Sequence, residues 1–299
     1  MDFQLGADQG ALRDGFREIL RARFGRDALR AAVDAPGLDR ELWRTLGKAG
    51  FFALCVPEAR GGLGQGAAEA VLVFEEAGRA LVPGPLVATF LAAGDVDGAA
   101  TGEAVVTAVS GTLVPWLAAA DVVRGDVTAA QPLRSVDPLT PLHRVPGRRE
   151  DGPAASLLLA AEQLGSACAS RDAAVRYAGE REQFGQPIGA FQAVKHLCAD
   201  LLVRTELTRA AVYAAAVTGD PREAVAAKLL ADDAAVRNAR DCLQVYGGMG
   251  FTWEADVHLH LKRAWVRARL GTTAARAEEE LAAALCGDVR EGWRDEGGW

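Results

Sequence analysis

A helical pattern that is broken and then restarted between Val175 and Ala199 constrains this fold most strongly. Apolar residues recur at helical spacing up to Arg181, and they recur again from Ile188 onward. Between the two runs lies Gly185-Gln186-Pro187, a combination that interrupts regular structure. The sequence therefore predicts two helices that meet at a corner.

The predicted corner carries side chains suited to an adenosine diphosphate group. Arg181 offers charge and a fork of donors to phosphate, Gln183 offers an amide, and Phe184 offers a face for stacking. An alternative is a plain helix–helix corner, with Phe184 in the core and Arg181 in solvent. From the chemistry of these residues alone both interpretations stay open.

A second stretch, from Gln244 to Phe251, ends a long helical pattern in glycines. Gly247 and Gly248 permit a positive φ and let the backbone approach a ligand closely. The alternative here is a simple helix C-cap.

The remaining sequence predicts helices on both sides of a short β-prone region. An amphipathic pattern covers Leu12 to Phe24, another begins at Leu38 with Asp39 near its start, and residues 102–146 contain short β-prone segments. These segments are Val105–Val109, Asp121–Val123 and Val127–Thr128. Long helices with apolar stripes follow from Pro153, which indicates a bundle.

The helix predicted over residues 221–246 has the clearest start. Asp220 suits the cap, Pro221 the first helical position, and Glu223 a capping box. Asp232 lies on its apolar stripe, either as a paired buried carboxylate or because the stripe rotates; we favour rotation. A last helix is predicted to end near Cys286, before a tail over residues 287–299.

Composition excludes several classes of protein. A net charge of -7 argues against nucleic acid or an anionic membrane as the main partner. The 5 cysteines lack metal spacing and are expected to be buried thiols in a reducing compartment. The N-terminus shows no basic segment followed by an apolar run, so we expect a cytoplasmic protein.

The two glycine-containing stretches together resemble the C-terminal helical domain of acyl-CoA dehydrogenases. The resemblance lies in YAGEREQFGQPIGAFQAVKHLCADL and CLQVYGGMGFTWEADVHLHLKRA, and it is specific over residues 153–272. It is looser over residues 1–95, where VPEARGGLG and FEEAGRALVPGPL resemble the N-terminal domain. The implied fold is mainly α: an N-terminal helical domain (1–100), a reduced β region (101–150), a C-terminal four-helix bundle (151–286) and a tail (287–299).

The resemblance also implies FAD as cofactor and oxidation of an acyl-CoA thioester to its α,β-unsaturated form. In this family the flavin ring lies on the middle domain of one subunit, while the adenosine diphosphate end reaches the C-terminal domain of a neighbour. The positions that match the second role are Arg181, Gln183, Phe184, Ile188, Gln192, Gln244, Gly247 and Gly248.

The flavin-ring half of the family pattern does not match. No threonine-glutamate-proline segment followed by glycine and serine occurs between residues 100 and 146. The two family positions of the catalytic glutamate correspond to Ala155 and Leu270, and neither side chain can accept a proton. Glu162 and Glu254 are the nearest substitute bases, although each also suits a structural role. His258 and His260 are expected to point to different faces, which disfavours a metal site.

Three hypotheses compete. The leading one is a non-catalytic subunit of a heteromeric FAD-dependent acyl-CoA dehydrogenase. It would form a heterotetramer with a catalytic subunit, and the acyl-CoA would be bound through that partner. The second is a complete flavin-dependent oxidoreductase with a relocated base. The third is a helical scaffold whose corner merely packs.

Overall fold

The N-terminal part of the chain is helical. The structure is a computed structural model that describes residues 5–295, with side chains described over residues 5–287. Asp39 caps one of the early helices as predicted, because its carboxylate accepts from the backbone N–H groups of Glu41 and Leu42. The helices of this part are α1 (Ala7–Arg23), α2 (Arg26–Asp34), α3 (Arg40–Lys48), η1 (Glu58–Arg60), α4 (Ala67–Arg79) and α5 (Leu86–Ala92).

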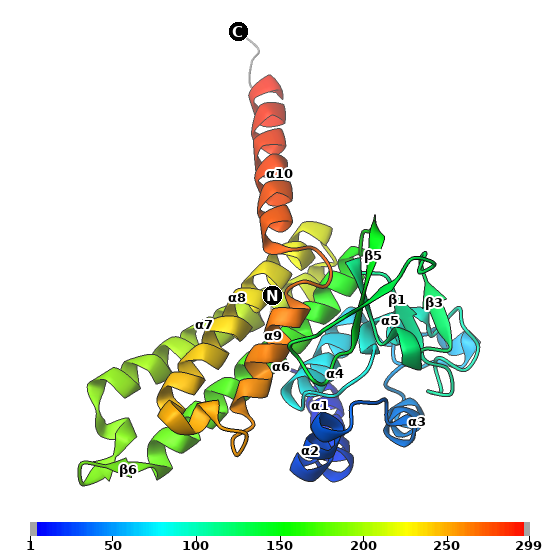
Figure 1. Cartoon of the computed structure of the whole chain (residues 1–299). Coiled ribbons are helices and arrows are strands. Elements are labelled where there is room, and N and C mark those ends of the chain that lie inside the picture. The colour runs from blue at the N-terminus through cyan, green and yellow to red at the C-terminus, as the bar shows by residue number, and fades with distance from the viewer. Residues whose placement is uncertain (1–4, 296–299) are drawn as a thin grey trace.

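Short strands form the central region, at the right of Figure 1. β1 (Val106–Ala108) pairs in parallel with β3 (Val122–Arg124). β5 (Leu142–Arg149) pairs antiparallel with both β2 (Gly111–Pro115) and β4 (Gln131–Leu133). A single 3-10 turn, η2 (Leu117–Ala119), separates β2 from β3.

One predicted β segment is wrong. Val127 and Thr128 lie in the loop between β3 and β4, where the Asp126 carboxylate accepts from the N–H (3.0 Å) and the hydroxyl (2.8 Å) of Thr128. This local hydrogen bonding favours a turn over a strand.

The C-terminal part is a bundle of long helices. It is built from α6 (Pro153–Glu180), α7 (Gln192–Thr218), α8 (Pro221–Tyr246) and α9 (Val257–Arg267). Between α6 and α7 lie β6 (Glu182–Gln183), β7 (Gln186–Pro187) and η3 (Ile188–Ala190), and between α8 and α9 lies η4 (Gly247–Phe251). The mainly α fold predicted from the sequence, with its C-terminal bundle, is therefore confirmed.

The last helix, α10 (Ala274–Asp295), extends away from the bundle in Figure 1. It continues past the predicted end at Cys286, so that end is wrong, and residues 296–299 of the predicted tail lie outside the described residues. Cys286 is exposed, which also corrects its assignment as a buried thiol.

The start of α8 follows its sequence signals with one exception. Asp220 accepts from the N–H of Arg222 at 2.7 Å, and Pro221 occupies the first helical position. Glu223 does not complete a capping box, because its carboxylate accepts from the Thr218 hydroxyl at 2.6 Å instead. Among the described helices, none is long and apolar enough to cross a membrane.

The N-terminal helices and the bundle share one core because α4 and α6 cross closely. A Cβ added at Gly78 would lie 2.0 Å from the carbonyl oxygen of Glu162, and one added at Gly165 would lie 2.0 Å from that of Glu75. Only glycine permits this separation of the two backbones. The largest apolar cluster accordingly extends from Phe16 in α1 to Ala231 in α8.

Candidate functional site

The predicted corner is a tight hairpin between two helices. We use "the corner" for residues 181–192. Phe184 and Gly185, at its tip, have φ values of 56° and 80°. Two successive residues with positive φ are typical of two-residue hairpin turns, whose twist matches that of the flanking strands.

Phe184 points into solvent. Its side chain is 92% exposed, the highest value among the large apolar side chains of the described residues. It touches Phe191 edge to face, with ring centroids 6.1 Å apart. The interpretation that places Phe184 in the core is therefore wrong. A positive φ costs a residue with a Cβ about 1–2 kcal/mol, and strain retained at an exposed residue suggests a role in binding.

Polar side chains in the corner and at the end of α8 are exposed, and several of them have no partner among the described residues. Arg181 is exposed, and its guanidinium makes no ion pair or hydrogen bond with any described residue. Gln192 and Gln244 are likewise exposed, and their side-chain amides have no partner within the described part of the chain. Gln183 donates to the carbonyl of Glu182 at 2.7 Å.

We call residues 247–251 the glycine turn. Gly247 has φ 59° and ψ -139°, a conformation that side chains with a Cβ rarely adopt. At Gly248 an added Cβ would meet no atom within 4 Å, so packing inside this chain does not require glycine there. The backbone of the glycine turn is therefore open to close approach by a ligand.

The fold brings the corner and the glycine turn to the same end of the bundle. The rings of Tyr177, in the last turn of α6, and Tyr246, in the last turn of α8, stack with centroids 4.0 Å apart and planes 14° apart. Ile188 packs against the same apolar cluster, which contains Cys242 and Leu243. In Figure 1 this end lies around β6, at the lower left. We call it the bundle end.

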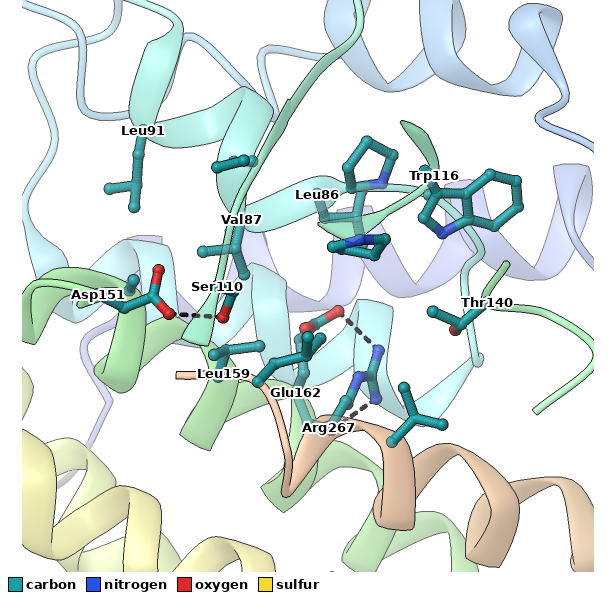
Figure 2. A pocket seen from close by; sticks show the side chains of 18 of the residues that line it. Leu86, Val87, Leu91, Ser110, Trp116, Thr140, Asp151, Leu159, Glu162 and Arg267 are labelled. Atoms are coloured by element: carbon teal, nitrogen blue, oxygen red, sulfur yellow. Dashed lines mark hydrogen bonds and ion pairs between the residues drawn. The ribbon is translucent and has the colours of Figure 1, made fainter. Parts of the chain in front are cut away.

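A second feature, the central pocket, lies between α5, the strands, α6 and α9 (Figure 2). Its volume is about 140 Å³. Small-molecule sites usually measure roughly 300–1,000 Å³, so this pocket is small. Its apolar walls include Leu86, Val87, Leu91, Trp116, Leu159 and Val266.

Both positions that the resemblance assigns to the catalytic glutamate line this one pocket. Ala155 contributes from the first turn of α6, and Leu270 from the turn that follows α9. The two positions are far apart in sequence, and the fold brings them to a common cavity. Neither side chain carries a group that can take a proton.

The substitute bases proposed from the sequence are not available in the pocket. Glu162 lines the pocket and is buried, but its Oε1 accepts from Arg267 Nη2 at 2.6 Å. Burial lowers the pKa of Arg267 to about 10, although the Glu162 carboxylate opposes the shift. Glu254 is exposed and lines a separate cleft, where its backbone carbonyl accepts from Arg26.

A carboxyl group that the sequence did not single out lies in the same pocket. Asp151 accepts from the hydroxyl of Ser110, and that hydroxyl accepts from the N–H of Gly271 at 2.7 Å. Burial raises the pKa of Asp151, although the Ser110 hydrogen bond opposes the shift. Sequence reasoning missed both residues because Ser110 and Asp151 meet only in the folded chain.

Asp232 is a paired buried carboxylate, so the favoured rotation of the stripe is wrong. It accepts from Lys228 Nζ at 2.5 Å and from Gln163 Nε2 at 3.0 Å. Lys228 is fully buried, and a lysine needs such a partner in the interior. The sequence did indicate this ion pair, since Lys228 lies four positions before Asp232 and such side chains are neighbours on a helix.

The two histidines of α9 have separate surroundings. His258 packs against Trp253, and burial lowers the pKa of its imidazole to about 4. His260 lies beside the Ser166 hydroxyl at 3.2 Å, and burial lowers its pKa to about 3. The described residues contain no cluster of three or more side chains that could hold a metal ion.

Comparison with protein families covers both helical parts of the chain. The acyl-CoA dehydrogenase N-terminal domain matches residues 6–103, and the acyl-CoA dehydrogenase C-terminal domain matches residues 155–281. Acyl-CoA dehydrogenase IpdE2 of Mycobacterium tuberculosis is 37% identical over 292 residues, which cover 87% of this chain and 91% of that protein. The chain belongs to the acyl-CoA dehydrogenase family. Strands β1 to β5 lie in the interval between the two matched domains.

Two solved structures share this fold over nearly the whole chain. The ChsE4-ChsE5 complex from Mycobacterium tuberculosis aligns with a TM-score of 0.83 at 23% identity and covers 96% of this chain and 99% of that chain. A variant of the Tcur3481-Tcur3483 steroid ACAD aligns with a TM-score of 0.83 at 24% identity, covering 96% of this chain and 100% of that one. At these identities the likeness establishes the fold.

Proposed function

We propose that this chain is the non-catalytic subunit of a heteromeric FAD-dependent acyl-CoA dehydrogenase. Its bundle end would hold the adenosine diphosphate end of FAD, and a partner subunit would supply the flavin-ring site and the catalytic glutamate. The observation that carries the proposal is the central pocket, where Ala155 and Leu270 occupy both family positions of the base. The acyl-CoA substrate would then be bound by the partner.

The bundle end fits the diphosphate end of FAD. Arg181 and Gln244 have no side-chain partners among the described residues, Phe184 offers an exposed ring, and a Cβ added at Gly248 would meet no atom within 4 Å. Guanidinium and backbone N–H groups are the usual donors to phosphate oxygens. These side chains would bind and orient the nucleotide portion.

The central pocket does not fit the flavin ring. A cavity of about 140 Å³ is close to the engineered cavity of about 150 Å³ that holds a single benzene ring, whereas the flavin ring system is tricyclic. FAD, when bound, supplies the acceptor for the hydride in this chemistry. Because the ring has no room in this pocket, we propose that the reacting part of FAD lies on the partner.

The structural relatives support a heteromeric assembly. The ChsE4-ChsE5 complex and the Tcur3481-Tcur3483 enzyme each combine two differently named components, and single chains of both share the fold of this protein. We transfer that organisation to this chain as part of the proposal, with a heterotetramer as the expected assembly.

The alternative is a complete enzyme with a relocated base, and one observation favours it. Asp151 is a carboxyl group in the central pocket, just before the start of α6, and its pKa is raised. A raised pKa is typical of a carboxyl group that exchanges protons during catalysis. Its hydrogen bond with Ser110 gives it a structural role as well.

Expression alone and with candidate partner dehydrogenases tests the proposal. The chain alone should purify without flavin absorbance, whereas the co-expressed complex should be yellow, active and heteromeric by native mass spectrometry. A yellow, active homo-oligomer of this chain would refute the proposal. If the chain co-purified with neither flavin nor a dehydrogenase, the scaffold hypothesis would replace it.

A further inference from the structure

Helix α7 is apolar on two opposite faces. The face toward the bundle buries Leu201 and Val212, as expected for a helix of a packed core. The opposite face also carries large apolar side chains, but these are open: Val203 and Val217 are each 56% exposed, and Leu207 is 63% exposed. A helix that is apolar on all sides is normally buried on all sides. The outer face of α7 is therefore expected to be covered in the assembled protein.

We call the outermost line of side chains on α7 the outer stripe. Its members follow one another at intervals of three or four positions, so they lie along one side of the helix. The outer stripe contains no charged residue over about 27 Å, at about 1.5 Å per residue, whereas the solvent face of a surface helix is normally charged or polar. Its members are Ala199, Val203, Leu207, Ala210, Ala214 and Val217.

The sizes of these side chains make the outer stripe complementary to itself. From the N-terminal end they are small, large, large, small, small and large, and from the C-terminal end they are large, small, small, large, large and small. Two copies of α7 that cross antiparallel therefore oppose a large side chain to a small one throughout. Leu207 meets Ala210 of the second copy, and Val203 meets Ala214. A two-fold contact requires such self-complementarity, whereas a parallel arrangement would oppose side chains of equal size.

The charges at the two ends of the outer stripe fit the same arrangement. Lys195 lies one helical turn before Ala199, and its ammonium has no ion-pair partner among the described residues. Asp220 lies just after the C-terminal end of α7, where it caps α8. Antiparallel crossing brings the N-terminal end of one α7 to the C-terminal end of the other. Lys195 of one copy would then lie near Asp220 of the second copy.

We infer that the outer stripe is a self-association surface, at which two copies of this chain pack antiparallel through α7. It begins about two helical turns beyond the corner and is separate from the bundle end. The contact requires neither FAD nor a catalytic partner, so its failure would leave the proposed function standing. If each copy also binds one catalytic subunit at its bundle end, the contact joins two heterodimers into the proposed heterotetramer.

Sedimentation equilibrium of the free, full-length chain tests the inference. We expect a monomer–dimer equilibrium over roughly 1–200 μM, because a contact made mainly by one helix lies at the small end of specific interfaces. Leu207→Glu should weaken the dimer by at least about tenfold, since it would bury a charge without a partner. Val136→Glu changes an equally open valine in the strand region and should leave the dimer unchanged. A chain that stays monomeric, or a dimer that Leu207→Glu leaves intact, would overturn the inference.

A swap of side-chain sizes tests the antiparallel pairing itself. Ala210→Leu alone opposes two leucines and should weaken the dimer by about tenfold, because overpacking costs about 1–3 kcal/mol. The double variant Leu207→Ala/Ala210→Leu restores one large and one small side chain at each contact, so it should regain the parental affinity within about threefold. Both positions are exposed, and alanine and leucine are good helix formers, so each variant should fold. A double variant that dimerises no better than Ala210→Leu would refute the pairing.

Discussion

The polar side chains at the bundle end and those around the central pocket differ in where they find their partners. Arg181 and Gln244 are exposed and have no partner within the described residues, whereas Glu162 and Arg267 are buried and paired with each other. Under the proposed function, these two places correspond to the two ends of one cofactor. This difference is expected if the bundle end binds another molecule, as we propose, while the Glu162 and Arg267 side chains beside the central pocket bind each other.

Removing the carboxylate of the buried pair should have the largest effect. Glu162→Ala leaves the Arg267 guanidinium buried without a counter-charge, so we expect a loss of about 3–5 kcal/mol in the free energy of unfolding, measured with urea. Glu206→Ala is the matched control, because Glu206 pairs with Arg171 on the surface and should cost less than about 1 kcal/mol. Equal losses in the two variants would contradict the distinction between the two regions.

Substitutions at the bundle end should change FAD binding rather than the stability of the free chain. In the complex with its partner, Arg181→Ala should weaken FAD retention by about tenfold to a hundredfold, because charge-assisted hydrogen bonds contribute about 1.5–3 kcal/mol. The melting temperature of the free chain should not change, since Arg181 has no partner within the described residues. Arg237→Ala, another exposed arginine, serves as the control and should leave FAD retention intact. Equal FAD retention in both variants would remove Arg181 from the site.

At the hairpin tip, replacing Phe184 by glycine should raise the free energy of unfolding but weaken FAD binding. Phe184→Gly should raise the free energy of unfolding by about 1 kcal/mol, because glycine accepts the φ of 56° without cost, while FAD retention in the complex falls. Phe184→Ala should lower FAD retention equally but give no such stabilisation, because it keeps the Cβ. If the glycine variant were no more stable than the alanine variant, the strain would not exist.

Asp151 should contribute a small dependence of stability on pH. Because its pKa is raised above the ordinary value of 3.8, the folded chain holds the proton more tightly than the unfolded chain does. That stabilising contribution is complete below pH 3.8 and is lost as the pH rises through the raised pKa. Asp151→Asn should therefore gain stability relative to the parent chain as pH rises, by less than about 1 kcal/mol, since the residue is only partly buried.

The same variant separates the two functional candidates. In the co-expressed complex, Asp151→Asn should leave turnover unchanged if the partner carries the base. Loss of turnover in a folded, flavin-loaded complex would support the relocated base instead.

Local patterns in the sequence were sufficient for much of the fold. Asp39, Asp220 and Pro221 mark helix starts that the structure contains, because caps act on the backbone within a few residues. The corner and the glycine turn were equally predictable, since Gly185-Gln186-Pro187 and Gly247-Gly248 are clusters that favour a break in a helix. The predicted capping box at Glu223 is wrong because the Glu223 carboxylate accepts a hydrogen bond from the Thr218 hydroxyl instead.

The candidate site was predictable only in part. The sequence identified Arg181 and Phe184, but it could not say whether the ring faced the core or solvent. Asp232 was misassigned because its partners are Lys228, on the same helix, and Gln163, on another. Ser110 and Asp151 carried no local pattern at all.

By itself, the sequence determined the order of the helices and the short strand region. It also determined that Ala155 and Leu270 carry no proton acceptor. Both follow from residue identity and short-range periodicity, which are properties of the chain alone. Only the tertiary structure decided that these two positions share one small pocket and that Glu162 is engaged by Arg267. Those facts depend on contacts between residues far apart in sequence. Such contacts form only when α4 and α6 cross at their glycines and the strands and α9 pack beside them.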